Sequence, residues 1–213
     1  MNRRDLLHAI TAVAALAALA PLSAAGAAGS LTATPSQSRG PFYPDRLPLD
    51  DDNDLVRVQS QPDLARGEFT DLTGQVLDEA GEPIRGAVVE IWQCDANGRY
   101  IHRGDSGGRP RDPGFQGYGR FETGADGGYR FRTIKPVPYP GRAPHIHFAV
   151  QAPGHRPLVT QMYVEGAPEN QVDWLLNAVS DPAARASLIV PFLPIRSDTT
   201  ALAARFDLVL AAD

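Results

Sequence analysis

Two histidines alternate with apolar residues in the segment 144–150, and their spacing could bind a metal ion. In a strand, successive side chains point to opposite faces, so His145 and His147 would lie side by side on one face. Paired histidines also occur as core or surface residues that bind nothing. Because Cys94 is the only cysteine, further ligands would be oxygen donors. A two-histidine, one-carboxylate site would need an acidic residue from outside this strand, which contains none.

Two tyrosines are candidate oxygen donors. Tyr100 ends the segment 91–100, and Tyr139 stands between prolines, six residues before His145. Taken alone, a loop tyrosine between prolines is typical of a packing residue whose hydroxyl stays in water. Metal binding by Tyr100 and Tyr139 is therefore indicated only by the motifs that surround them.

The elements that must position these residues are predicted to be strands. Short apolar runs are separated by turn sequences such as AGEP and ADGG, and the chain contains 20 Gly and 19 Pro. The predicted strands are 72–79, 86–93, 119–123, 129–134, 145–150, 158–164, 187–193 and 204–210. Only 171–185 has a helical pattern. This arrangement predicts an all-β fold, an antiparallel β-sandwich with long loops and at most one or two short helices.

The sequence divides into three regions. Residues 69–213 form the predicted sandwich domain, and residues 29–68 lack a helical period and are rich in Pro, Asp and Gln, which predicts an extended N-terminal arm. The acidic run 50–52 lacks the glycine and the final glutamate of a calcium loop, so a solvated loop is expected.

Residues 1–28 are predicted to be a signal peptide. Arg3 and Arg4 precede an apolar stretch at 9–22 and a tail of small residues, and the arginine pair resembles a twin-arginine signal. The unbroken apolar run is shorter than the roughly 18 residues of a membrane span. We therefore expect export to the periplasm or the medium, without a stable membrane anchor.

Composition excludes several classes of protein. The formal charge of −5 gives no electrostatic reason to expect nucleic acid as a partner. The 43% of hydrophobic residues is too high for a disordered chain. One cysteine excludes an intrachain disulfide framework and a multi-cysteine metal site.

Five motifs together resemble one enzyme family. VEIWQCDANGRY, DPGFQGYGRF, GGYRFRTIKPVPYP, HIHFAV and LVTQMYVEG follow one another as in the intradiol ring-cleavage dioxygenases, and most resemble the iron-bearing subunit of protocatechuate 3,4-dioxygenase. The resemblance runs from about residue 72 to residue 210. It implies a β-sandwich in which Tyr100, Tyr139, His145 and His147 hold one mononuclear non-haem Fe(III) per chain. Such an ion favours anionic oxygen and lowers the pKa of a phenol from about 10.

The resemblance also implies a reaction and the residues that assist it. A catechol-type ring would be cleaved by O2 between its hydroxylated carbons to give a cis,cis-muconate-type product, with iron as Lewis acid. Tyr139 would leave the metal and accept a substrate proton, Arg142 would stabilise developing negative charge, and Gln161 would hydrogen-bond the substrate. The implied substrate pocket also includes Trp92, Pro41 and Tyr43.

The chain departs from the protocatechuate enzymes in one loop. Only Pro140 and Gly141 separate Tyr139 from Arg142, where those enzymes have a longer insertion, so a more open pocket is expected. One chain carries the full ligand set and could act as a homo-oligomer or alone. The alternative is a prealbumin-like β-sandwich binding module without catalysis, which the segment 71–93 also resembles.

Overall fold

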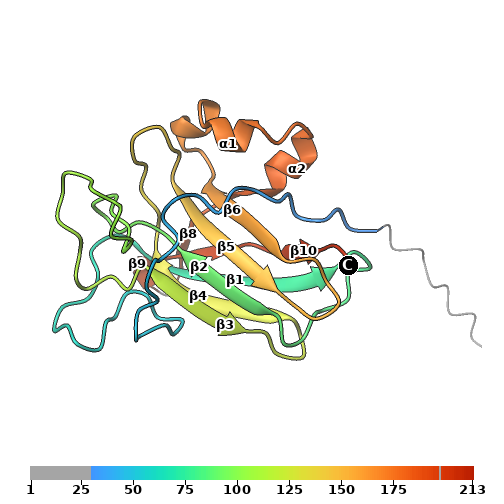
Figure 1. Cartoon of the computed structure of the whole chain (residues 1–213), viewed down its shortest axis with the longest axis horizontal. Coiled ribbons are helices and arrows are strands. Elements are labelled where there is room, and N and C mark those ends of the chain that lie inside the picture. The colour runs from blue at the N-terminus through green and yellow to red at the C-terminus, as the bar shows by residue number, and fades with distance from the viewer. Residues whose placement is uncertain (1–29, 197) are drawn as a thin grey trace, which may run out of the picture.

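The computed structural model describes residues 30–196 and 198–213, so the predicted signal peptide lies outside the described residues. Two β-sheets stack face to face, and the long loops gather at one end of the sandwich (Figure 1). Within the described ranges, no helix has the length and apolar character needed to cross a membrane.

The first sheet is organised around its longest strand. Strand β1 (Phe69–Asp78) pairs antiparallel with β4 (Gly128–Ile134) on one side. On its other side it pairs in parallel with β9 (Asp198–Arg205) and with β10 (Leu208–Leu210). Strand β8 (Leu193–Ile195) extends this sheet by pairing antiparallel with β9.

The second sheet carries the histidine strand at its centre. Its order is β3 (Tyr118–Glu122), β2 (Val88–Trp92), β5 (His145–Gln151), β6 (Leu158–Val164) and β7 (Ile189–Val190). All pairs are antiparallel except β6 with β7.

The predicted all-β sandwich is confirmed, but its sheets are mixed rather than purely antiparallel. The 3-10 helix η1 (Pro168–Gln171) and the helices α1 (Trp174–Asn177) and α2 (Pro182–Ser187) follow β6. A crossing connection of this kind lets the next strand run parallel to its neighbour, whereas a hairpin cannot. The predicted strands 187–193 and 204–210 are each divided between two strands, β7 and β8 for the first and β9 and β10 for the second.

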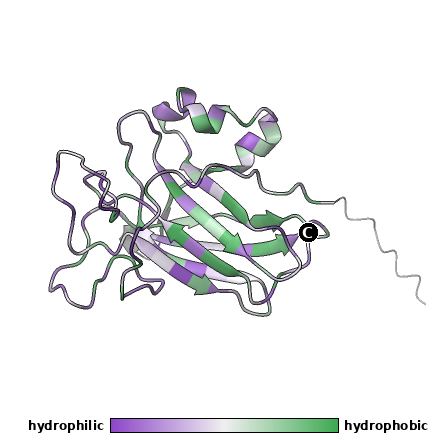
Figure 2. Cartoon of the chain, in the orientation of Figure 1, coloured by the Kyte–Doolittle hydropathy of each residue, from purple (hydrophilic) through white to green (hydrophobic). Residues whose placement is uncertain are grey.

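The main hydrophobic core lies between the two sheets. Strand alternation sends one side-chain face of each sheet inward, including Val89 and Ile91 of β2 and Ile146 and Phe148 of β5, which are all fully buried. Figure 2 shows hydrophobic colour concentrated on the strands and hydrophilic colour along the loops. This core fixes the twist and spacing of the sheets that carry the site.

A second cluster packs on the outer face of the β2–β5 sheet. Trp92, Tyr100 and Tyr118 are buried there, with Phe42 and Tyr43 of the N-terminal segment against them. Both faces of the sheet are thus covered, so six of the seven residues of β5 are buried, where an open sheet would bury every second one.

The segment 30–68 reaches the outer face without forming a helix or a multi-residue strand. It is tied to the sandwich by backbone hydrogen bonds from Gln37 N–H to the Val159 carbonyl, 2.7 Å, and from Thr34 N–H to the Val209 carbonyl, 3.0 Å. These bonds place residues 37–43 over the histidine strand.

Candidate metal centre

The histidine pair occupies the outer face of the second sheet. The Nε2 atoms of His145 and His147 lie 3.2 Å apart, and both rings are almost completely buried. Ile146 between them points into the core between the sheets. The register sets Trp92 opposite His147 on one side and Gln161 opposite it on the other, so three strands contribute to one patch.

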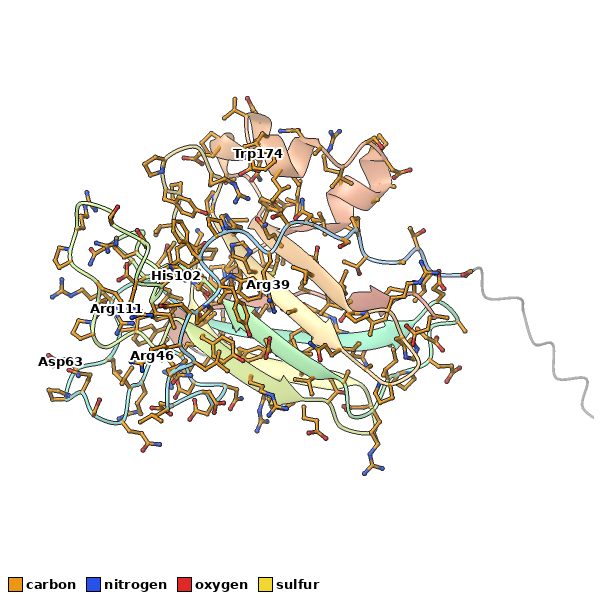
Figure 3. All side chains as sticks on the ribbon, viewed as in Figure 1. Arg39, Arg46, Asp63, His102, Arg111 and Trp174 are labelled. Atoms are coloured by element: carbon orange, nitrogen blue, oxygen red, sulfur yellow. The ribbon has the colours of Figure 1, made fainter. Side chains whose placement is uncertain are left out.

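The two candidate tyrosines come from loops at the same end of the sandwich. The Tyr100 hydroxyl, from the loop after β2, lies 3.2 Å from His145 Nε2. The Tyr139 hydroxyl, from the loop after β4, lies 3.4 Å from the same nitrogen. In Figure 3, His102 marks the loop after β2 and Trp174 marks helix α1. The structure thus brings together the four residues that the resemblance implied as ligands.

The polar atoms around His145 Nε2 cannot all form hydrogen bonds with it, but their arrangement suits the ligands of a metal ion. The ring sets its Nδ1 2.6 Å from the Ala143 carbonyl, so Nδ1 is assigned the proton and Nε2 presents its lone pair. One lone pair cannot satisfy two phenols and a second imidazole. Metal–ligand bonds of roughly 2.0–2.2 Å would hold neighbouring ligand atoms about 3 Å apart, as they are here.

The chemistry of the donors narrows the kind of ion. Among the residues that the structure describes, no group of three or more His, Cys, Asp or Glu side chains is placed to hold a metal ion. A site on His145 therefore depends on the tyrosine oxygens. Two imidazoles with two phenolates suit a hard, highly charged cation, and Fe(III) fits this donor set.

Burial sets the protonation states in the absence of a cation. It lowers the pKa of His145 to about 3, with a smaller contribution from the Arg142 charge, and it holds the pKa of His147 well below its ordinary value. Both rings are neutral and can bind a metal. Burial also raises the pKa of Tyr100 and of Tyr139 above the ordinary value. A bound cation is thus required to turn these phenols into tyrosinates at neutral pH.

Trp92 supports His147 instead of lining open space. The indole stacks on the imidazole with ring centres 4.7 Å apart and planes 7° from parallel, and it is fully buried. His147 Nδ1 has no hydrogen-bond partner among the described residues. Stacking therefore replaces the hydrogen bond that usually orients a ligating histidine.

The N-terminal segment covers the tyrosine and histidine rings. A Cβ added to Gly40, whose φ is +70°, would lie 3.3 Å from His147 Cε1. Phe42 stacks on Tyr100 with ring centres 5.2 Å apart, while Pro41, which precedes Phe42 in the chain, is exposed. Tyr43 meets Trp92 edge-on at 5.0 Å, and its hydroxyl donates to Glu90 at 3.1 Å. Of the two predicted pocket residues in this segment, Tyr43 has its hydroxyl engaged with protein.

Arg142 reaches the centre because of a tight turn. Its backbone N–H donates to the Tyr139 carbonyl at 2.9 Å, and Gly141 takes the positive φ of 80° that this turn requires. Its guanidinium donates through Nη2 to Gln161 Oε1 at 2.5 Å. Gln161 is fully buried and donates to the Ser38 carbonyl at 3.0 Å. The structure therefore joins the two polar residues that sequence reasoning placed beside the substrate.

Asp173 is a site residue that sequence reasoning missed. Its carboxylate receives the Arg142 Nε–H at 2.9 Å. Burial opposes ionisation, but hydrogen bonds from Leu176 N–H, Ala143 N–H and Arg142 hold the pKa of Asp173 below its usual value. The one available signal was an Asp in front of a short apolar run, which is typical of a helix N-cap.

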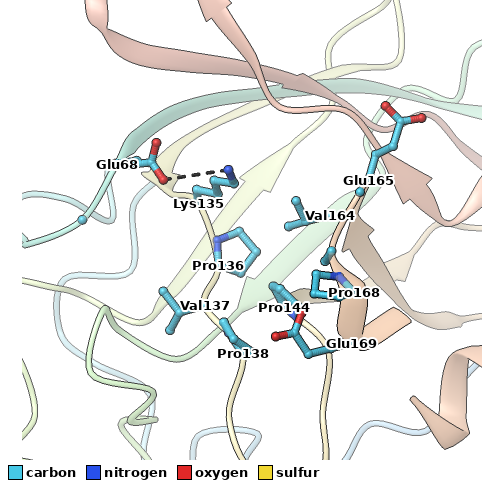
Figure 4. Close-up of a pocket in the computed structure, with 13 residues that line it drawn as sticks. Glu68, Lys135, Pro136, Val137, Pro138, Pro144, Val164, Glu165, Pro168 and Glu169 are labelled. Atoms are coloured by element: carbon cyan, nitrogen blue, oxygen red, sulfur yellow. Dashed lines mark ion pairs between the residues drawn. The ribbon is translucent and has the colours of Figure 1, made fainter. Parts of the chain in front are cut away.

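A separate groove lies behind the Tyr139 loop. It has a volume of about 460 Å³ between residues 135–138 and 164–169, and Lys135 pairs with Glu68 at 3.8 Å at its edge (Figure 4). The groove includes none of the predicted ligands. The candidate site is therefore the histidine and tyrosine cluster and not this groove.

Known proteins share this sequence and architecture. Residues 38–212 match the family model described as Dioxygenase. The chain is 44% identical over 169 residues to the protocatechuate 3,4-dioxygenase beta chain of Burkholderia cepacia, covering 75% of this chain and 71% of that one. It is 32% identical over 204 residues to hydroxyquinol 1,2-dioxygenase of Corynebacterium glutamicum, covering 81% of this chain but only 62% of that enzyme.

A solved structure agrees with these sequence matches. The dioxygenase domain of a dioxygenase–carbohydrate-binding fusion from Streptomyces sp. SirexAA-E superposes with a TM-score of 0.61 at 34% identity. The match covers 85% of this chain and 100% of that domain. These similarities favour a catalytic protein over the prealbumin-like binding module.

Proposed function

The chain belongs to the intradiol ring-cleavage dioxygenases, and from this premise we propose that it is a non-haem Fe(III) enzyme that cleaves catechol-type rings with O2. The observation that carries the proposal is the approach of Tyr100 and Tyr139 to His145 Nε2, within 3.4 Å. We assign one ion per chain to these residues together with His147. When bound, Fe(III) would supply Lewis-acid activation of the two adjacent substrate oxygens.

The two tyrosines have different roles in this proposal. Tyr100 is 3% exposed and is held under Phe42, whereas Tyr139 is only partly buried and belongs to the loop before the histidine strand. Tyr139 is therefore the phenol that can move aside and take a proton from an incoming catechol. Tyr100 would remain in place and supply an anionic oxygen ligand.

Arg142 and Gln161 orient the substrate and stabilise its charge. The guanidinium is fixed beside the ligands by Gln161 and Asp173, so its positive charge faces the ring without rearrangement during the reaction. A fixed cation of this kind favours the anionic form of the bound diol. Trp92 acts from behind by holding the plane of His147.

Isotope incorporation and a substrate panel test the proposal. Iron-loaded protein should consume O2 with catechol, protocatechuate, hydroxyquinol or a substituted plant catechol, and at least one should react much faster than the others. With labelled O2, both oxygen atoms should enter a ring-opened muconate-type product. Absence of oxygen uptake with every diol, in protein shown to contain iron, would contradict the proposed activity.

We also propose that the substrate is met outside the cytoplasm and that the chain works alone or as a homo-oligomer. Residues 1–28 support export, and the short loop through Pro140 and Gly141 supports a pocket open to substituted phenolic catechols.

Replacing both Arg3 and Arg4 by lysine should retain the protein inside expressing cells. Mass spectrometry of exported protein should find an N-terminus between about residues 26 and 29, and an intact residue 1 would contradict export by cleavage.

A further inference from the structure

We propose that Asp173 is a positioning residue that holds Arg142 and the residue next to the histidine strand in their working geometry. The effect of Asp173 on catalysis rests on the proposed function, whereas the contacts of its side chain belong to the fold and do not depend on the reaction. Asp173 lies outside the ligand set and joins α1 to the loop that carries Tyr139 and Arg142.

The carboxylate of Asp173 is fully engaged by four donors. Its Oδ1 accepts from the backbone N–H groups of Leu175 and Leu176, both at 3.0 Å, which caps helix α1. Its Oδ2 accepts from Arg142 Nε at 2.9 Å and from Ala143 N–H at 2.8 Å. The side chain is 0% exposed, so water cannot replace any of these partners.

This arrangement fixes the plane of the Arg142 guanidinium. Nε is bound to Asp173, Nη2 is bound to Gln161 at 2.5 Å, and Nη2 also approaches the Tyr163 hydroxyl at 3.4 Å. In the described part of the chain, Nη1 donates no hydrogen bond to protein. The Asp173 contact thus leaves one edge of the guanidinium for an anionic substrate oxygen.

The same carboxylate also steadies the histidine strand. Asp173 holds residue 143 through its N–H, and the carbonyl of residue 143 accepts from His145 Nδ1 at 2.6 Å. That second bond sets which nitrogen of His145 faces the tyrosines. Asp173 therefore acts on the charge-stabilising arginine and, through one intervening residue, on a proposed metal ligand.

The Asp173→Asn substitution tests this positioning role. An amide has the size of the carboxylate, but only one of its two polar atoms can accept hydrogen bonds. The asparagine oxygen can accept either from the N–H groups that begin α1 or from the Arg142 and Ala143 donors, but not from both sets. Its NH2 group then faces the other set, and two donors cannot bond each other. Asp181→Asn is the matched control. Asp181 caps α2 through one bond to Ala184 N–H at 2.7 Å and is exposed.

The first readout is magnetic resonance of metal-free protein labelled with 15N. The Arg142 Nε–H signal, identified by its loss in Arg142→Lys, should exchange slowly in the wild type and in Asp181→Asn, and quickly in Asp173→Asn. An unprotected wild-type signal would overturn the inference. Because no iron is present, this result is independent of the proposed function.

The second readout is the kinetics of the iron-loaded enzyme. Asp173→Asn should lower kcat/KM about 10- to 100-fold, the usual effect of losing a partner of a site residue, and Asp181→Asn should change it less than about 3-fold. In the Arg142→Lys background, Asp173→Asn should cost clearly less than it does in the wild type, and the remaining loss is the part carried through residue 143 to His145. Equal losses in both backgrounds would show that Asp173 does not act through Arg142. An inactive wild type with a protected Nε–H signal would contradict the proposed function and not the contact.

Discussion

Replacement of His145 by alanine is expected to abolish iron binding and ring cleavage together. His145 Nε2 is the atom that Tyr100, Tyr139 and His147 all approach, at 3.2 to 3.4 Å. Without this nitrogen, the site lacks the proposed ligand around which the other three are arranged. Metal content should therefore fall below about 0.1 ion per chain. Activity should fall at least about 1000-fold, which corresponds to about 4 kcal/mol of transition-state stabilisation.

The control for this experiment is another histidine. His155→Ala removes a partly exposed ring that contacts the Pro153 carbonyl in the turn after β5, away from the cluster, and should leave iron content and activity unchanged. Metal analysis and oxygen uptake on both variants give the comparison. A His145→Ala protein that keeps stoichiometric iron and full turnover would show that the metal is bound elsewhere.

The Gly74→Ala substitution is expected to destabilise the fold strongly. A Cβ at this position of β1 would lie 2.0 Å from the Phe206 carbonyl oxygen and 2.6 Å from the Tyr129 hydroxyl oxygen. The Tyr129 hydroxyl donates to that same carbonyl, so a buried hydrogen bond passes directly over the glycine. The strands must separate to admit a methyl group, at a cost of about 3 kcal/mol or more. Tm should then fall by roughly 6–12 °C.

Two further variants separate this clash from a general effect of adding a methyl group. At Gly108 an added Cβ would meet nothing within 4 Å, so Gly108→Ala should shift Tm by less than about 2 °C. Adding Tyr129→Phe to Gly74→Ala should restore little stability, because the backbone oxygen remains. A Gly74→Ala protein as stable as Gly108→Ala would contradict the described packing of β1.

The histidine strand was predictable because one local rule governs it. The period of two residues places His145 and His147 on one face wherever the strand lies, and the first sheet packs against the opposite face. The approach of Tyr100 and Tyr139 was not predictable from periodicity, since both stand on irregular loops. Only the resemblance of the surrounding motifs implied that these loops converge.

Other features depended on long-range packing that local sequence does not encode. The parallel pairs of β1 with β9 and β10 join residues far apart in the chain, such as Phe69 and Ala201, so local periodicity does not predict them. Trp92 alternates with core residues, yet it is buried on the outer face because the N-terminal segment covers it. Asp173 was missed because its partner Arg142 lies 31 residues away in the chain.

An Fe(III) centre built from two histidines and two tyrosines should be visible in the absorption spectrum of the iron-loaded mature protein. The protein should be coloured by a tyrosinate-to-Fe(III) charge-transfer band that is absent in His145→Ala. Addition of catechol without oxygen should shift this band, because the diol would compete with Tyr139 for the ion. A colourless protein that binds zinc, or no metal at all, would contradict an Fe(III) centre of this composition.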